Sequence, residues 1–398
     1  MNLLFVTPYL PSESSGHAGA QLIYRNIIAL SKIHNLTVVS FEDRNENEMI
    51  DKLKVNRIDV HTVFYPRNQK SLIGKINSLI RNFSALLSFL KANEPFFIAK
   101  YDKKNMRILL SDLIIKNNFD LVQVEYNVMH HYADLFKNIP SIVVFHDIST
   151  KLYERGKDLD IKSDQRSYQI SKKVEIKIAN KFDAVVTLTE QDKLYLRNLG
   201  YSKKIYVIPP QVKNVISLPT NKLPNTICFI GSFYRETNIQ AVEKLIDEIF
   251  LNISVPVELN IAGKGMPKKI KKKIDDLNGI NYHGFVADID EFISKQMLMV
   301  APIELGAGLK MKIPHSLANG TPVITTPVGA EGINIDHKNG LWICKSNSEM
   351  IEKINSLLPK NNKLIDRGNK GKSAVNELFS SKVICQKFEK LYSIVTKL

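Results

Sequence analysis

The stretch GAGLKMKIPH, residues 306–315, combines residue types that bind phosphate. Gly306 and Gly308 can leave neighbouring backbone N–H groups accessible just before a predicted helix. Lys310 and Lys312 place two cations in the first turn of that helix. Amides at a helix start and ammonium groups together attract an anion. The stretch therefore predicts a diphosphate site, with two lysines on a solvated helix face as the alternative.

Two other loops follow predicted strands and precede predicted helices. Residues 8–21, PYLPSESSGHAGAQ, bring Gly16 and Gly19 to a helix start, where their amides could face a phosphate or a reacting sugar. A simple tight turn explains the same glycines. Residues 232–238, SFYRETN, place Arg235 after the strand, where it either neutralises a ligand or stays solvated.

Two Asp-x-Asp strings, Asp158/Asp160 and Asp288/Asp290, are of the kind that can hold a divalent metal ion. The second string, within VADIDEF, fits the cap of a helix better. A lone string of this spacing is also weak evidence for a metal site. We therefore expect no metal and no cofactor, so that basic residues of the chain neutralise the ligand.

Short apolar runs that alternate with helical segments position these loops. Buried parallel strands read as continuous Val, Ile and Leu runs because helices cover both faces of their sheet. Seven such runs come first, at 3–6, 36–41, 59–65, 119–125, 141–147, 182–189 and 204–210. Six more follow, at 226–231, 257–263, 280–286, 297–303, 321–326 and 341–344. The alternation predicts an α/β protein with two Rossmann-like halves, whose ligands lie at the carboxyl ends of the strands.

The helical segments are predicted from apolar residues at a period of 3.6. One helix is expected over 239–250, behind a cap at Thr237 or Asn238. A long helix is expected to run through Lys181, and a shorter one near 309–319.

The chain divides at residues 211–225, a segment with two prolines and little periodicity that is typical of an interdomain linker. We expect a first domain over 1–212 and a second over 213–379. The last segment, 380–398, is expected to be a helix.

The composition is that of a globular protein, with 398 residues, 44% apolar and 24% charged. Its apolar runs are shorter than the roughly 20 residues of a membrane helix. The start, MNLLFVTPYLP, reads as a strand rather than a signal peptide. Cys228, Cys344 and Cys385 lie too far apart for a disulfide framework or a zinc site. We expect a cytoplasmic protein.

The charge is strongly basic, with 55 Lys and Arg against 40 Asp and Glu and a net charge of +15, which favours an anionic partner. Nucleic acid is not expected, because RNP strings, helix-turn-helix signatures and basic platforms with interleaved aromatics are missing. Residues 71–91 form a basic amphipathic helix pattern suited to an anionic inner-membrane surface. A core helix of the first domain is the alternative.

The string GAGLKMKIPHSLANGTPVITTPVGAEGI, residues 306–333, resembles the donor-site signature of the family 4 retaining glycosyltransferases of the GT-B fold. The first-strand loop with Gly19, the VVFHD segment, and FDAVVTLTEQD followed by VIPP match that family's N-terminal domain in order and spacing. The resemblance covers nearly the whole chain. It implies two Rossmann-like domains facing a cleft, with the acceptor bound by residues 1–212 and the nucleotide sugar by residues 213–379. It also implies that the C-terminal helix, 380–398, crosses back to the N-terminal domain.

The resemblance also implies site residues. His146 would contact the donor sugar near the reacting carbon, and Gly19 would lie beneath the donor phosphate or sugar. Lys310 and Lys312 would neutralise the diphosphate during catalysis. The other donor-binding positions are Arg235, Gly306, Gly308, Leu309, His315 at the ribose, Val286 near the base, and Glu331.

The chain departs from the family pattern at two places. Many relatives carry a pair of glutamates where this chain has Ala307 and His315. His315 can hydrogen-bond a ribose hydroxyl or serve a structural role. The Arg and Lys that many relatives place after the first strand of the second domain are Ser232 and Asn238 here. Neutralisation of the phosphates would then depend on the three basic residues named above.

These implications predict a metal-independent, hexosyltransferase-like retaining glycosyltransferase. It would move a sugar from a UDP-type or GDP-type nucleotide sugar to a glycan or lipid-linked glycan, building bacterial lipopolysaccharide, O-antigen or capsule. Negative charge grows on the leaving diphosphate, so aimed amides and cations would lower the barrier. The alternatives are a GT-B enzyme that does not transfer the sugar, such as an epimerase, and a catalytically silent glycan-binding scaffold.

Overall fold

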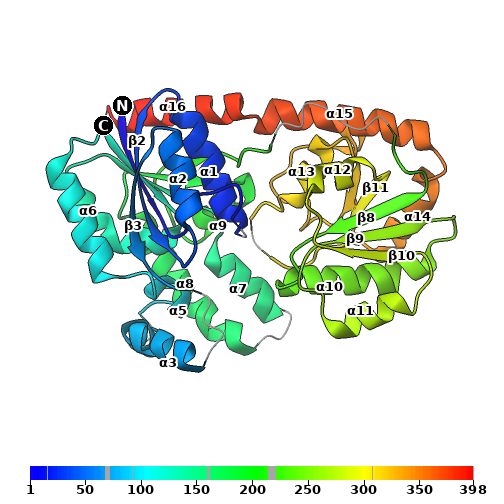
Figure 1. Ribbon diagram of the computed structural model, residues 1–398, viewed down its shortest axis with the longest axis horizontal. Helices are drawn as coiled ribbons and strands as arrows, with labels where there is room; N and C mark the ends of the chain where they lie inside the picture. The colour runs from blue at the N-terminus through cyan, green and yellow to red at the C-terminus, as the bar shows by residue number, and fades with distance from the viewer. Residues whose placement is uncertain are drawn as a thin grey trace. The chain divides into compact units, whose positions relative to one another are not determined.

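The computed structural model describes residues 1–15, 17–67, 72–91, 93–158, 162–213, 221–306 and 308–397. The chain forms two compact units, drawn in Figure 1. The first combines Met1–Gln211 with Ser381–Leu398, and the second is Val212–Ser380. Each is described by itself.

The first unit is built on a seven-stranded parallel sheet with the order β3-β2-β1-β4-β5-β6-β7. The strands are β1 (Asn2–Thr7), β2 (Asn35–Glu42), β3 (Asp59–Phe64), β4 (Leu121–Glu125), β5 (Ser141–Phe145), β6 (Ala184–Thr187) and β7 (Ile205–Val207). Every residue of β4 and β5 is buried, as expected for central strands with helices on both faces. All seven strands predicted for this half are present.

Alternate residues of β1 supply two separate cores. Leu4 and Val6 belong to one core, and Leu3 and Phe5 belong to the other. Successive side chains of a strand point to opposite faces, so these two cores are the two faces of the sheet. The covering elements are α1 (Ala18–Leu30), α2 (Asn47–Val55), α3 (Leu72–Arg81), α4 (Phe83–Leu90), α5 (Phe96–Ala99), α6 (Lys104–Lys116), η1 (Asn127–Phe136), α7 (Ser149–Asp158), α8 (Lys162–Ala179), α9 (Glu190–Asn198) and α16 (Ser381–Val395).

Two helix predictions for this unit need correction. The expected helix over 71–91 is divided, because its described part forms α3 and α4, which are separated at the buried Asn82. The single long helix expected to reach Lys181 is wrong, because α7 and α8 are separate helices that pack against each other. A helix over 149–181 would be about 50 Å long. Turning back keeps both helices against the unit.

The C-terminal helix α16 belongs to the first unit, so the expected return of the chain is confirmed. Its apolar face is buried beside α1, and Figure 1 shows the two helices next to each other. The buried residues of α16 are Ile384, Phe388, Leu391, Tyr392 and Val395. The last turns of the sequence therefore complete a core that the first strand begins.

The second unit is built on a six-stranded parallel sheet with the order β10-β9-β8-β11-β12-β13. The strands are β8 (Thr226–Ile230), β9 (Glu258–Ala262), β10 (Ile280–Gly284), β11 (Leu298–Ala301), β12 (Val323–Thr325) and β13 (Leu341–Ile343). The helical elements are α10 (Glu236–Lys244), η2 (Leu245–Ile249), η3 (Phe250–Asn252), α11 (Lys268–Asp275), α12 (Ile289–Ser294), α13 (Lys312–Ala318), η4 (His337–Asn339), α14 (Asn347–Leu357) and α15 (Asn361–Phe379). The predicted α/β architecture with two Rossmann-like halves is confirmed.

The start of α10 differs from the expected cap at Thr237 or Asn238. Arg235 occupies the cap position, and α10 begins at Glu236. Asn238 is a residue of the helix itself, and its side-chain Nδ2 donates to the Ser232 carbonyl oxygen at 2.8 Å. Asn238 therefore does not cap α10, and its side-chain oxygen is available to the candidate site.

Candidate functional site

Three cations of the second unit come together beyond the carboxyl ends of β8 and β11. Lys312 Nζ lies 4.2 Å from the ring centre of Phe229 and donates to Asn238 Oδ1 at 2.7 Å. Burial, together with the nearby charges of Arg235 and Lys310, lowers the pKa of Lys312 to about 7. These three basic residues are the ones that the sequence assigned to phosphate neutralisation.

Lys310 is held by the glycine loop and by one carboxylate. Its Nζ donates to the Gly308 carbonyl oxygen at 2.6 Å and lies 3.8 Å from Glu331 Oε2. The Glu331 side chain is only 6% exposed. Two residues predicted from the same motif, 21 positions apart in the sequence, therefore meet in the structure.

Glycine is needed at several points around these cations. Gly306 and Gly308 have φ of 109° and 68°, in the left-handed region that disfavours other residues. A β-carbon on Gly231 would lie 2.9 Å from the Asn238 side chain and 3.2 Å from Lys312 Nζ. The backbone of this loop and the end of β8 thus make room for the Lys312 ammonium.

The helix after the glycine loop is shorter than expected. It begins at Lys312 and has seven residues, so Lys310 precedes it rather than lying in its first turn. The positive charge of this site therefore comes mainly from side chains. Leu309 is partly buried against the core of the unit. Position 307 lies outside the described residues.

His315 is tied to an acid of the same unit. Its Nε2 lies 2.6 Å from Asp290 Oδ1, and Asn319 and Lys213 donate to the same carboxylate. These partners hold the pKa of Asp290 below its usual range. Asp288 accepts a hydrogen bond from the Glu291 backbone and caps α12, as VADIDEF predicted. Asp160 of the other string lies outside the described residues.

Two exposed aromatic side chains lie near the expected base-binding segment. Phe285, next to Val286, is 66% exposed, and Lys264 Nζ lies 4.0 Å from its ring centre. Tyr234 is 78% exposed and packs where a β-carbon on Gly265 would stand. Val286 itself is partly buried against the core. The resemblance places residues 284–286 near the base, which includes Phe285, whereas Tyr234 was not predicted as a site residue.

His146 follows β5 in the first unit and is bound to a buried acid. Its Nε2 lies 2.6 Å from Oε2 of Glu125, the last residue of the neighbouring β4. Gln123 Nε2 donates to the other oxygen of Glu125 at 2.6 Å, and Tyr392 of α16 donates to Gln123 at 2.6 Å. The C-terminal helix therefore supports the histidine through two hydrogen-bonded side chains.

Sequence reasoning missed Glu125 and Gln123, although a signal was present. Both are polar residues that alternate within FDLVQVE, an otherwise apolar buried strand. A buried carboxylate requires hydrogen-bonding or charged partners. The partners of this one are distant in sequence, which is why the strand pattern alone could not identify them.

Tyr126 connects His146 to Gly19. Its ring stacks on the imidazole with 3.9 Å between the ring centres and 9° between the planes. A β-carbon on Gly19 would lie 1.7 Å from Tyr126 Oη. Gly19 therefore makes space for this ring, and its contact with the donor stays a prediction. Gly16 lies outside the described residues.

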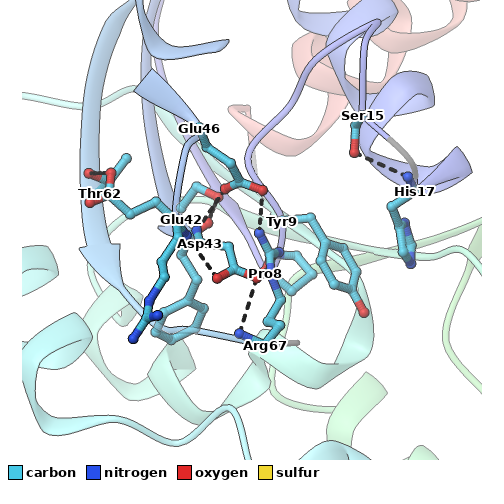
Figure 2. Close-up of polar contacts among 12 residues, drawn as sticks. Pro8, Tyr9, Ser15, His17, Glu42, Asp43, Glu46, Thr62 and Arg67 are labelled. Carbon is cyan, nitrogen blue, oxygen red and sulfur yellow. Dashed lines mark hydrogen bonds and ion pairs between the residues drawn. The ribbon is translucent and has the colours of Figure 1, made fainter. Parts of the chain in front are cut away.

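Tyr9, in the loop after β1, extends this group of rings. It stacks on His17 with ring centres 3.9 Å apart and meets Tyr126 edge-on at 5.8 Å. Arg67 lies over the other side of Tyr9, with its Cζ 5.3 Å from the ring centre. Figure 2 shows Tyr9, Arg67 and His17 at the ends of the first strands.

Glu94, His130 and His131 form a group with possible metal ligands within 4.8 Å of one another. Glu94 lies 3.1 Å from His130 Nε2 and 3.5 Å from His131 Nε2. Lys181 Nζ donates to His130 Nδ1 at 2.9 Å, and its charge opposes a metal cation at this place. The expected independence from metal stays a prediction.

Residues 224–360 match the family described as Glycosyl transferases group 1, and residues 48–213 match the one described as Glycosyltransferase Family 4. The two matches lie in the two units and together span most of the chain. The chain belongs to the group 1 glycosyltransferases. This glycosyltransferase has the GT-B fold, as its neighbours among solved structures show.

Among those structures, TarM has a TM-score of 0.71 at 16% identity, covering 98% of this chain and 99% of TarM. HepE of Anabaena, solved with UDP and glucose, has a TM-score of 0.70 at 14% identity, covering 99% of each chain. Sucrose-phosphate synthase from Thermosynechococcus elongatus has a TM-score of 0.71 at 14% identity, again covering 99% of each. At these identities the likeness shows the fold.

Two curated relatives match parts of the glycosyltransferase. A poly(ribitol-phosphate) alpha-N-acetylglucosaminyltransferase of Staphylococcus aureus is 26% identical over 240 residues, 58% of this chain and 48% of the relative. An uncharacterized 44.6 kDa protein in the cps region of Klebsiella pneumoniae is 25% identical over 135 residues, 31% of this chain and 34% of the relative. The chain thus spans half or less of the curated relatives that it matches.

Proposed function

We propose that this glycosyltransferase moves a sugar, with retention at the reacting carbon, from a nucleotide-diphosphate sugar to a glycan or lipid-linked glycan. The acceptor would belong to a bacterial surface polysaccharide, such as lipopolysaccharide, O-antigen or capsule. The observation that carries the proposal is the convergence of Arg235, Lys310 and Lys312 around the glycine loop of the second unit. Three cations facing one another are unfavourable without an anion and suit a diphosphate.

The chemistry of the donor explains why cations are placed here. As the bond from the sugar to the leaving phosphate breaks, the sugar gains oxocarbenium character and the diphosphate gains negative charge. Fixed ammonium and guanidinium groups stabilise that charge more in the transition state than in the ground state. The reaction then needs neither a metal nor a cofactor, with Glu331 orienting Lys310.

His146 is proposed to contact the donor sugar. The contact with Glu125 uses Nε2 of the imidazole and leaves Nδ1 for a second hydrogen bond. That Nδ1 is buried and has no hydrogen-bond partner among the described residues. A sugar hydroxyl would supply the partner that a buried polar atom requires.

The relatives guide the choice of substrates to test. The Staphylococcus relative is named for transfer of N-acetylglucosamine to poly(ribitol phosphate), and the Klebsiella relative is encoded in a cps region. HepE is described in complex with UDP and glucose. These names support a UDP sugar as the first donor to test and a surface polymer as the first acceptor.

A donor screen tests the proposal directly. UDP and GDP are titrated by calorimetry, and their sugars are incubated with the enzyme and followed by mass spectrometry. Binding of one nucleotide with slow release of its sugar is expected. Conversion of the donor to a stereoisomer would favour an epimerase, and binding of neither nucleotide would favour a silent scaffold.

A peripheral position at an anionic membrane is proposed from α3 and α4. Five apolar side chains on these helices, at a spacing of four and three residues, are at least 40% exposed: Ile76, Ile80, Phe83, Leu87 and Leu90. In Figure 1, α3 lies at an outer edge of the first unit. Among the described helices, none combines the length and apolar character needed to span a bilayer. An apolar stripe on a basic protein suits the surface of an anionic bilayer.

Vesicle sedimentation tests this position. The enzyme is expected to sediment with vesicles containing phosphatidylglycerol and to a lesser extent with phosphatidylcholine alone. The double substitution Phe83→Ser with Leu87→Ser should release it, whereas Leu194→Ser, on the 58% exposed Leu194 of α9, should not. Equal sedimentation of all three proteins would remove the membrane contact.

A further inference from the structure

The first unit has a group of cations of its own. It consists of Arg81, Lys100 and Lys103, packed around the rings of Tyr65 and Tyr101. We call these five residues the acceptor cation group. Tyr65 follows β3, Arg81 ends α3, and the other three lie between α5 and α6.

Lys100 is the member with the fewest partners. Its Nζ lies 4.7 Å from the ring centre of Phe97 and 5.1 Å from that of Tyr101. The Lys100 ammonium group makes neither a hydrogen bond nor an ion pair with any residue that the structure describes. Burial and the charge of Arg67 both lower the pKa of Lys100. Its ammonium is thus held on rings beside another cation, without a counter-charge in contact.

Lys103 and Arg81 are fixed by neutral acceptors. Lys103 Nζ donates to the Arg81 carbonyl oxygen and to Asn82 Oδ1, each at 3.0 Å. The Arg81 guanidinium donates to the Pro66 carbonyl oxygen at 3.2 Å. Within the described ranges, neither side chain has a carboxylate within ion-pair distance. These bonds hold both cations in place and leave their charges in excess.

Arg67, the neighbouring arginine, is in a different state. Figure 2 shows it bound to Glu46 and Asp43, with 2.7 Å from Nη2 to Glu46 Oε1 and 3.1 Å from its backbone N to Asp43 Oδ2. Its charge is balanced by these acids. The excess positive charge therefore lies on the acceptor cation group and not on Arg67.

A series of rings joins the acceptor cation group to His146 within the same unit. Tyr101 donates its hydroxyl to Tyr9 Oη at 3.0 Å. Tyr9 meets Tyr126 edge-on, and Tyr126 stacks on His146. Aromatic faces and tyrosine hydroxyls suit the C–H faces and hydroxyl groups of sugars and polyols. The series thus runs from the cations through the buried Tyr101 to the candidate sugar-binding histidine.

We propose that Lys100, with Arg81 and Lys103 beside it, binds a phosphate group of the acceptor. This inference rests on the proposed function for the identity of the second substrate and names its chemical class. The acceptor is anionic, and its phosphate comes from a phosphodiester polymer or from a lipid-linked diphosphate. Phosphate supplies the charge-assisted bonds that Lys100 otherwise lacks.

Calorimetric titration with defined probes tests this site. The probes are a glycerol-phosphate hexamer, farnesyl diphosphate and, as a neutral control, hexaethylene glycol. At least one phosphate probe should bind the full-length enzyme. Lys100→Gln should weaken that binding by about tenfold or more, because a charge-assisted contact is lost. Lys100→Arg should retain it, and Lys104→Gln, on an exposed lysine four positions away, should match the unaltered enzyme.

The outcomes separate the two phosphate sources. Binding of the hexamer alone supports a polymer acceptor, and binding of farnesyl diphosphate alone supports a lipid-linked one. Equal affinity in Lys100→Gln, equal binding of the neutral probe, or binding of neither phosphate probe would overturn the site.

UDP titration of the same variants keeps this test apart from the proposed function. Lys100→Gln should bind UDP as the unaltered enzyme does, because Lys100 lies in the other unit from the donor cations. If the enzyme binds no nucleotide but still binds phosphate in a way that depends on Lys100, the proposed function is contradicted and the proposed phosphate site is not. Transfer that is indifferent to Lys100 would contradict only the site.

Discussion

The two units place reactive side chains at the carboxyl ends of parallel strands, but they treat charge in opposite ways. In the first unit, His146 is paired with the buried Glu125 and needs no ligand to complete the pair. In the second, Lys312 faces two other cations, and among the described residues its hydrogen bond goes to a neutral amide. The paired site is preorganised, whereas the cationic site is electrostatically incomplete until an anion binds.

The difference has an energetic reason. A buried acid and histidine 2.6 Å apart satisfy each other, so their positions are stable in the free protein. Clustered cations repel, and the pKa of Lys312 is lowered first by its burial and then by the charges of Arg235 and Lys310. A diphosphate would remove the repulsion, which makes ligand binding and protonation of Lys312 interdependent.

The largest effect is expected from the cationic site. Lys312→Ala should lower kcat/KM, because a charge-assisted phosphate contact is lost. The decrease should correspond to a loss of about 2 to 4 kcal/mol of transition-state stabilisation. Lys310→Ala should behave similarly. Initial rates of transfer measure the change, and the melting temperature checks folding. Unchanged turnover in both variants would remove the phosphate role and with it the contrast between the units.

The next effect concerns the paired site. His146→Ala should lower kcat by roughly 10²-fold, in the range for a positioned imidazole, with little change in UDP affinity. Glu125→Gln should also lower kcat, because the carboxylate that holds Nε2 of the imidazole is lost. Equal losses of UDP binding and turnover in His146→Ala would contradict contact with the sugar.

The clash expected between a side chain at position 19 and Tyr126 can be introduced by one substitution and partly relieved by a second. Gly19→Ala would place its β-carbon against Tyr126 Oη and should destabilise the enzyme by about 1 to 3 kcal/mol through overpacking. Denaturant unfolding measures the loss. Adding Tyr126→Phe removes the clashing oxygen and should recover part of the stability, whereas an additive loss in the double variant would exclude this contact.

The pH dependence of donor binding sharpens the comparison. The pKa of Lys312 in the free enzyme is about 7, and a bound diphosphate should raise it. Binding then takes up a proton, so UDP affinity should fall as pH rises above 7, by at most about tenfold per pH unit for one proton. The diphosphate itself is fully charged in that range, since its last pKa is near 6.

Lys312→Arg provides the matched control for this dependence, because a guanidinium stays protonated throughout the range. Its UDP affinity should be flat between pH 7 and 9. A slope that persists in Lys312→Arg would assign the titration to another group.

The smallest effect is expected at the C-terminal helix. Tyr392→Phe removes the hydrogen bond to Gln123 and should lower the free energy of unfolding by about 1 kcal/mol. It should also lower kcat modestly, because Gln123 orients Glu125. A control on the same helix is Ser393→Ala, whose hydroxyl bonds only its own helix among the described contacts. Equal effects of the two variants would exclude the connection.

Much of the fold could be predicted from the sequence because its signals are local. The apolar runs of all thirteen strands and the glycine loop at 306–308 depend on neighbouring residues alone. Two details differ because they depend on the surrounding structure. Arg235 occupies the cap position of α10, and the expected long helix to Lys181 is divided into α7 and α8, which pack against each other.

The sequence by itself therefore determined the two parallel sheets and the presence of Lys310 and Lys312 after a strand, since periodicity and spacing are properties of adjacent residues. Only the tertiary structure decided the partners. Glu125 meets His146 across two strands, Asn238 reaches Lys312 across 74 positions, and Tyr392 reaches Gln123 across 269. Such contacts follow from the order of strands in a sheet and from the return of the C-terminal helix to the first unit. No local pattern encodes either of these.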